Sequence, residues 1–150
     1  MISDLIKYHA EIDEVLKRYS ISVAVPQMGI ALHKITYNHD KRIFDYECIG
    51  FNETYKSLLQ LDDSNLKSVR YQELFPQNKE NKFDWASLIG HVGEFQSLTK
   101  YYCYSEPLNK WYRFIALCPE KGLTLLLAED ISNLKQEEIN QNRTKASNKS

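Results

Sequence analysis

Residues 95–131 read FQSLTKYYCYSEPLNKWYRFIALCPEKGLTLLLAEDI and give the clearest structural signal in the chain. Three runs of aromatic, aliphatic and β-branched residues alternate here with the turn-forming segments 106–109 (EPLN) and 120–122 (EKG). This arrangement predicts three consecutive strands joined as an antiparallel meander. In segments such as LTLLLA both alternating positions are apolar, so we expect internal helices on one face of the sheet and the N-terminal helix on the other.

Two more strands are predicted upstream of the meander. The segments 29–37 and 43–51 are rich in strand-forming residues and flank a polar turn, which indicates an antiparallel hairpin. At Asn52 the apolar spacing becomes helical, and its side chain is expected to cap a helix over residues 53–61.

The next part of the chain predicts helices and loops. Residues 62–82 are polar and contain Pro76, so we expect short helical turns and loops there. The longest internal helix is predicted over residues 83–93, with Gly93 in the left-handed position that ends it.

Both ends of the chain favour helices. Residues 1–19 place apolar side chains at three- and four-residue steps, the pattern of an amphipathic helix whose stripe covers either this domain's own sheet or a second copy of the chain. The candidate dimer contacts on this stripe are Leu5, Ile12 and Leu16. After Asp130 a polar exit helix is predicted, capped by Asp130 or Ser132, and it continues into a polar tail.

The composition is that of one globular domain. Hydrophobic residues make up 43% of 150 residues, and the net charge of -1 gives no electrostatic reason for a nucleic-acid or anionic-membrane partner. Charges interrupt the N-terminal helix, so no signal peptide or membrane contact is expected in these residues. Because Cys48, Cys103 and Cys118 are widely spaced, they are interpreted as small buried hydrophobes in a reducing cytoplasm. No pair of histidines has the spacing of metal ligands.

Several short motifs resemble those of the PAS family of sensory domains, over about residues 28–135. In chain order they are Phe51, Asn52 and Tyr55; Leu74, Phe75 and Pro76; Gly93-Glu94; Trp111-Tyr112; Pro119 to Gly122; and Asp130-Ile131-Ser132. The resemblance implies an α+β fold, with a five-stranded antiparallel sheet and helices on one face, an N-terminal amphipathic helix and a C-terminal exit helix. The corresponding divisions are a flanking helix and linker (1–27), the PAS domain (28–131), and the start of a signalling helix with its tail (132–150).

The resemblance also implies a function. PAS domains of this kind are non-catalytic input domains of bacterial signalling proteins, often homodimers, and they pass a signal to an output domain such as a histidine kinase or a diguanylate cyclase. The relay residues would be Asp130, Ile131 and Ser132. A small-molecule ligand would lie among seven pocket candidates, namely Tyr55, Phe75, Trp85, Ile89, Tyr102, Trp111 and Phe114.

The sequence does not identify a cofactor. Heme is not expected, because the histidine that binds heme in some PAS domains lies further upstream of the helix-ending glycine than His91 does. Covalent flavin is not expected either, because the cysteines lie on predicted strands. Two alternatives remain open: a ligand-free PAS dimerisation scaffold, and a small cone-shaped α+β enzyme of the isomerase or hydratase type, with Asp45, Tyr46 or Tyr102 around its pocket.

Overall fold

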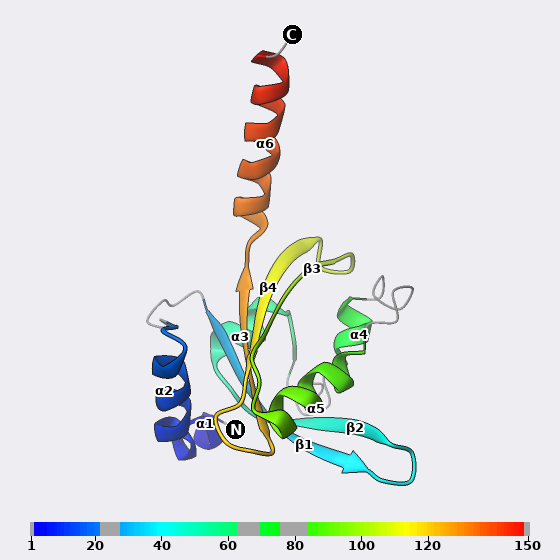
Figure 1. Cartoon of the computed structure of the whole chain (residues 1–150). Helices are drawn as coiled ribbons and strands as arrows, with labels where there is room; N and C mark the ends of the chain where they lie inside the picture. Colours follow the sequence, from blue (N-terminus) through cyan, green and yellow to red (C-terminus); the bar gives the residue numbers. More distant parts are fainter. Residues whose placement is uncertain (1, 22–27, 63–69, 76–83, 149–150) are drawn as a thin grey trace.

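The protein is built around one antiparallel sheet, shown in Figure 1. The computed structural model describes residues 2–21, 28–62, 70–75 and 84–148. The strands are β1 (Gly29–Asn38), β2 (Ile43–Phe51), β3 (Thr99–Ser105), β4 (Lys110–Leu117) and β5 (Leu123–Asp130). They lie in the order β2-β1-β5-β4-β3, and each neighbouring pair is antiparallel. The predicted meander, hairpin and α+β class are therefore confirmed.

Three helices cover one face of the sheet, which we call the inner face. They are α3 (Glu53–Leu58), α4 (Tyr71–Leu74) and α5 (Trp85–Phe95). The cap predicted for α3 is confirmed: Asn52 Oδ1 accepts hydrogen bonds from Tyr55 N at 2.9 Å and from Ile30 N at 2.9 Å, and Asn52 Nδ2 donates to Met28 O at 3.2 Å. One side chain thus ties the start of α3 to the start of β1.

The outer face is covered from the N-terminus. The single helix predicted over residues 1–19 is divided into α1 (Ile2–Lys7) and α2 (His9–Arg18). Between them Tyr8 leaves helical geometry (φ −102°, ψ 19°) and packs with Leu5 at the edge of the outer apolar cluster. The chain therefore bends along the sheet. Ile12 and Leu16 are buried in that cluster, so the apolar stripe covers the chain's own sheet.

A β-bulge in the hairpin sets which side chains point inward. The register of β1 with β2 shifts between Leu32 and His33, because Leu32 pairs with Gly50 whereas His33 pairs with Cys48. The extra residue, Ile49, packs against the outer cluster. As a result both Cys48 and Phe51 contribute to the inner core, which strict alternation would forbid.

The predicted end of the long helix at Gly93 is wrong. Helix α5 continues to Phe95, and Gln96, with φ 54°, is the left-handed residue that ends it. Gly93 lies inside the helix where it crosses the sheet, and a Cβ atom there would be 2.6 Å from Thr124 Oγ1. The glycine is needed for close approach of α5 to β5, and the pattern of a C-terminal cap gave a misleading boundary.

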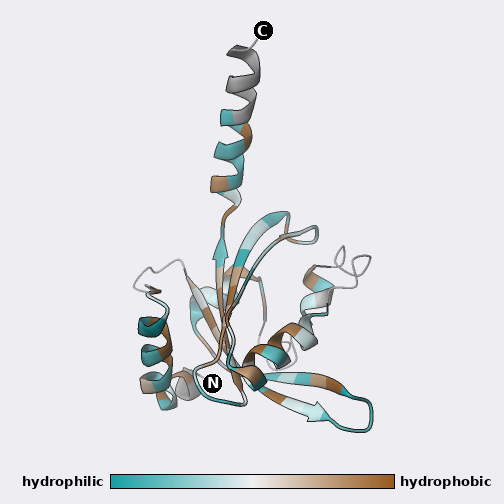
Figure 2. Cartoon of the chain, in the orientation of Figure 1, coloured by the Kyte–Doolittle hydropathy of each residue, from teal (hydrophilic) through white to brown (hydrophobic). Residues whose placement is uncertain are grey.

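The exit helix α6 (Ser132–Asn148) projects away from the sheet, as Figure 1 shows. Figure 2 shows that apolar residues concentrate on the packed strands and helices, whereas the described part of α6 is mainly hydrophilic. Its apolar residues Leu134 and Ile139 are 60% and 44% exposed. No described helix has both the length and the apolar character that a membrane span requires.

Candidate functional site

Five of the seven pocket candidates meet on the inner face. Tyr55, Phe75, Trp85, Ile89 and Phe114 are each at most 1% exposed and belong to one apolar cluster. Ring centroids of Trp85 and Phe114 lie 5.2 Å apart, those of Phe75 and Trp85 5.4 Å, and those of Phe75 and Phe114 5.6 Å. These are packing distances for aromatic pairs, so the protein's own rings occupy the space between them.

The other two candidates lie on the outer face. Tyr102 is 53% exposed on β3, and Trp111 on β4 packs against Tyr104 with a centroid distance of 5.4 Å. Successive side chains on a strand point to opposite faces, so Tyr112, the neighbour of Trp111, takes the inward position. Its hydroxyl donates to Leu58 O at 2.6 Å and ties β4 to the end of α3.

A buried polar chain, which no sequence pattern predicted, crosses the inner cluster. Tyr71 Oη lies 2.9 Å from His33 Nε2 and is also hydrogen-bonded to the hydroxyl of Tyr55. All three side chains are 0% exposed. Burial lowers the pKa of His33 to about 4, so the imidazole is neutral at pH 7. Strand alternation places His33 on the same inward face as Ala31 and Ile35, so the sequence did contain this part of the information. A polar residue is usually expected to face solvent, and the inward position was therefore not assigned.

The three cysteines are free and buried, as expected for small hydrophobes. Burial raises the pKa of Cys48 to about 11 and raises the pKa values of Cys103 and Cys118. All three thiols are therefore protonated at neutral pH, which disfavours nucleophilic chemistry at these positions.

The three relay candidates form a joint between the sheet and α6. Asp130 Oδ1 accepts a hydrogen bond from Ser132 N at 2.9 Å, and Asp130 Oδ2 lies 3.6 Å from the ammonium of Lys110. Burial raises the pKa of Asp130, but the hydrogen bonds from Ser132 and the Lys110 ammonium outweigh it and bring the pKa below its usual value. The carboxylate is thus charged at neutral pH.

The same joint is fastened to β4 through the backbone of Trp111. Trp111 N donates to Ser132 Oγ at 3.0 Å, and Ile131 N donates to Trp111 O at 2.9 Å. One turn into α6, Lys135 Nζ lies 5.1 Å from the centroid of the Trp111 indole, close enough for a cation–π interaction. The base of α6 is therefore attached to two adjacent strands.

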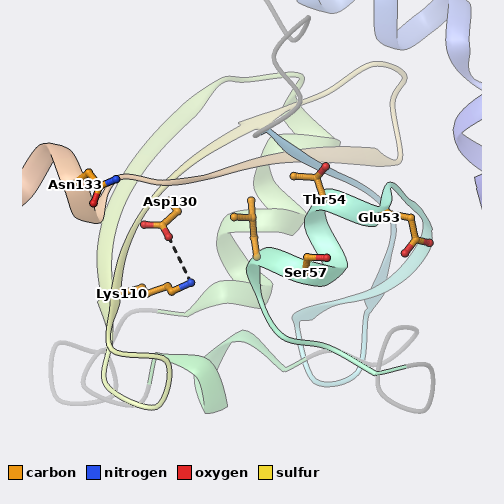
Figure 3. Close-up of a pocket in the computed structure, with 7 residues that line it drawn as sticks. Glu53, Thr54, Ser57, Lys110, Asp130 and Asn133 are labelled. Carbon is orange, nitrogen blue, oxygen red and sulfur yellow. Dashed lines mark ion pairs between the residues drawn. The ribbon is translucent and has the colours of Figure 1, made fainter.

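An open groove of about 600 Å³ lies beside this joint. Figure 3 shows the ion pair of Lys110 with Asp130 on one side of it and the side chains of α3 on the other. Helix α3 contributes Glu53, Thr54, Ser57 and Leu58, and the strand ends and α6 contribute Lys110, Asp130 and Asn133. Leu58 packs against the inner cluster and also lines the groove, which combines charged groups with hydroxyls.

No protein-family model and no curated protein matches the chain. Among solved structures, the chain is similar to the blue-light activated histidine kinase of Erythrobacter litoralis, with 13% identity and a TM-score of 0.47 over 71% of this chain and 33% of that one. It is also similar to the PAS domain of a protein from Colwellia psychrerythraea, with 12% identity and a TM-score of 0.46 over 79% of this chain and 98% of that one. The match thus spans about a third of the kinase.

The order of elements and the five-stranded antiparallel sheet, with α3, α4 and α5 on one face, are those that the sequence resemblance implies. The fold is PAS-like. Within this PAS-like sheet β2 and β3 are the two edge strands. The enzyme alternative placed Asp45, Tyr46 or Tyr102 around its pocket; Asp45 and Tyr46 lie on β2 and Tyr102 lies on β3, at opposite edges of the sheet.

Of the described histidines, His33 is buried on β1 and His91 lies on α5. His91 is on the exposed side of α5, where its ring contacts Phe44 and Phe95 with centroid distances of 4.9 and 5.6 Å. It does not face the inner cluster. In the described part of the chain, no group of three or more His, Cys, Asp or Glu side chains could hold a metal ion.

Proposed function

We propose that this chain is a non-catalytic sensory input domain of a bacterial, cytoplasmic signalling protein, which acts on an output domain such as a histidine kinase or a diguanylate cyclase through α6. The observation that carries the proposal is the joint at Asp130, Ile131 and Ser132. Helix α6 is polar and projects from the domain, so its own packing does little to hold it in place. Its direction depends on the two strands to which its first turn is attached.

Contacts of two adjacent residues on β4 support a route from the inner cluster to α6. The hydroxyl of Tyr112 is bonded to α3, and the backbone of its neighbour Trp111 is bonded to Ile131 and Ser132. A signal that shifts the inner helices would therefore displace the strand that holds α6. Output requires that the two arrangements differ in their affinity for the signal, because only such a difference shifts their populations.

The test is amide hydrogen exchange of α6 in single and double variants. Ser132→Ala removes the acceptor of Trp111 N, and faster exchange is expected in the first turns of α6. Tyr112→Phe removes only the hydroxyl bonded to Leu58, on the inner face of β4, and should also speed exchange in α6. In the Ser132→Ala background the effect of Tyr112→Phe should shrink, because the connection to the helix is already loosened.

The control for this experiment is Lys121→Met. Lys121 forms an exposed ion pair with Glu94 at 3.8 Å, at the other end of β4 and β5, so exchange in α6 should be unchanged. If Tyr112→Phe leaves α6 exchange as it is in the unmodified protein, the proposed relay is wrong.

The ligand-free dimerisation scaffold is the second candidate, and the aromatic packing of the inner cluster favours it. In both versions the proposed dimer forms through the N-terminal helices at the half-buried Leu5, because Ile12 and Leu16 are buried against the chain's own sheet. Native mass spectrometry of the purified protein separates the two versions. A dimer with additional bound mass supports a ligand-binding sensor, and a dimer of bare chains supports the scaffold.

A further inference from the structure

The groove beside the joint has the charge pattern of a binding site for a small molecule. Its volume of about 600 Å³ falls within the roughly 300–1,000 Å³ that small-molecule sites occupy. It contains the ammonium of Lys110 and the carboxylates of Asp130 and Glu53. These are one positive and two negative charges, and the hydroxyls of Thr54 and Ser57 line the same groove.

Lys110 is placed to receive an anionic group. Its ion pair with Asp130 is long, at 3.6 Å, and its side chain is 38% exposed. An ammonium has three N–H donors, so a second carboxylate can approach without breaking the contact with Asp130. Asp130 is already engaged by Ser132 N and Lys110.

The opposite wall favours a cationic group. Glu53 is exposed in the first turn of α3, at the end of that helix furthest from Lys110 in Figure 3, and Thr54 and Ser57 line the same groove. A simple anion would be repelled by the net negative charge of the groove, and a simple cation would leave Lys110 without a new partner. A molecule that carries both charges satisfies both walls, and Leu58 offers it an apolar surface.

We propose that this groove binds a short peptide, with its C-terminal carboxylate on Lys110 and its N-terminal ammonium toward Glu53, because the two charges of a free α-amino acid lie on one carbon and are too close together to reach both (Figure 3). The bound molecule connects α3 with the strand ends at the base of α6. Its influence on α6 rests on the proposed relay function, whereas its binding does not. The groove is thus assigned as an effector site next to the relay residues.

The binding test uses isothermal titration calorimetry at constant ionic strength. The probes are a set of dipeptides and tripeptides with free termini, compared with acetate and ethanolamine, which carry only one of the two charges. At least one zwitterion should bind with a dissociation constant below about 1 mM, and both single-charge probes should bind at least about tenfold more weakly.

Two charge variants and one filled groove make the test specific. Lys110→Met and Glu53→Gln should each weaken binding by about tenfold, and Lys121→Met should not change it. Ser57 is exposed, so Ser57→Trp should fill the groove and abolish binding while circular dichroism stays unchanged. If no zwitterion gives saturable heat up to about 10 mM, or if all three groove variants bind like the unmodified protein, the site is refuted.

Hydrogen exchange of α6 with the bound zwitterion tests the effector role separately. Slower exchange in the first turns of α6 supports it. Binding without any change in α6 would leave the site in place and overturn its role as an effector. The variants Tyr112→Phe and Ser132→Ala, which need no ligand, report on the relay by themselves.

Discussion

His33 makes the stability of the protein depend on pH. Its pKa falls from the usual 6.5 to about 4 on burial, so between these values the unfolded chain binds more protons than the folded one. The contribution of His33 to the free energy of unfolding is therefore complete above pH 6.5 and is lost as the pH falls toward 4. We expect this group to lower the free energy of unfolding by up to about 3 kcal/mol over that interval, measured by urea denaturation at several pH values.

The histidine contribution is isolated by substitution. His33→Gln removes the titrating group and should flatten the decline between pH 6.5 and 4. His91→Gln, on the exposed side of α5, should retain it. Equal pH dependence in the unmodified protein and in His33→Gln would show that the buried imidazole is not responsible.

Replacement of Gly93 by alanine is expected to destabilise the protein, although this substitution usually stabilises a helix. Replacing glycine by alanine inside a helix normally stabilises it by about 1 kcal/mol. At position 93, however, the new methyl group would meet Thr124 Oγ1 at 2.6 Å and Ile35 Cδ1 at 2.8 Å. We expect Gly93→Ala to lower the free energy of unfolding by about 1–3 kcal/mol in denaturant titrations. A neutral or stabilising result would mean that α5 and β5 can separate at little cost.

Asn52 joins two elements, so its loss should affect both. Asn52→Ala removes the cap of α3 together with both contacts to the start of β1. The free energy of unfolding should fall by about 1–3 kcal/mol. Asn52→Asp keeps the two accepted bonds but places a carboxylate oxygen against Met28 O in place of the donor, so it should restore only part of the stability lost in Asn52→Ala in the same chemical denaturation experiment.

The exposed hairpin turn provides a matched control for Asn52. Asn38 Oδ1 accepts from the backbone N–H groups of Asp40 and Lys41, each at 3.0 Å, but this turn is exposed. Asn38→Ala should therefore cost less than Asn52→Ala. Equal losses from the two substitutions would argue against a special role for the contact between α3 and β1.

The whole molecule depends on α2 covering the outer face. Leu16 is 7% exposed and packs in the outer cluster with Val15 and Leu32. Leu16→Glu should detach α2 and lower the free energy of unfolding by about 3 kcal/mol or more, as followed by chemical denaturation. If Leu16→Glu gives a monomer as stable as the unmodified protein, the leucine contacts a second copy instead.

Leu5 offers a gentler test of the proposed dimer. Its side chain is only half-buried at the edge of the outer cluster, so Leu5→Glu should disturb folding less than Leu16→Glu. Sedimentation analysis should then report folded monomers. A dimer that persists in Leu5→Glu would place the interface elsewhere.

The sequence by itself determined the features that depend on local patterns. Turn residues and apolar runs defined the meander and the hairpin, and Asn52 stood directly before the change to helical spacing, where it caps α3. These predictions succeeded because strand alternation, turns and caps involve residues that are close in the chain.

Only the tertiary structure decided the features that depend on register and close approach. The break at Tyr8, the inward position of Tyr112 in place of Trp111 and the role of Gly93 all follow from contacts between distant segments. The chain of His33, Tyr71 and Tyr55 and the groove at Lys110 each combine side chains from separate elements. Local spacing carries no information about such pairs, because packing of the helices on the sheet brings them together.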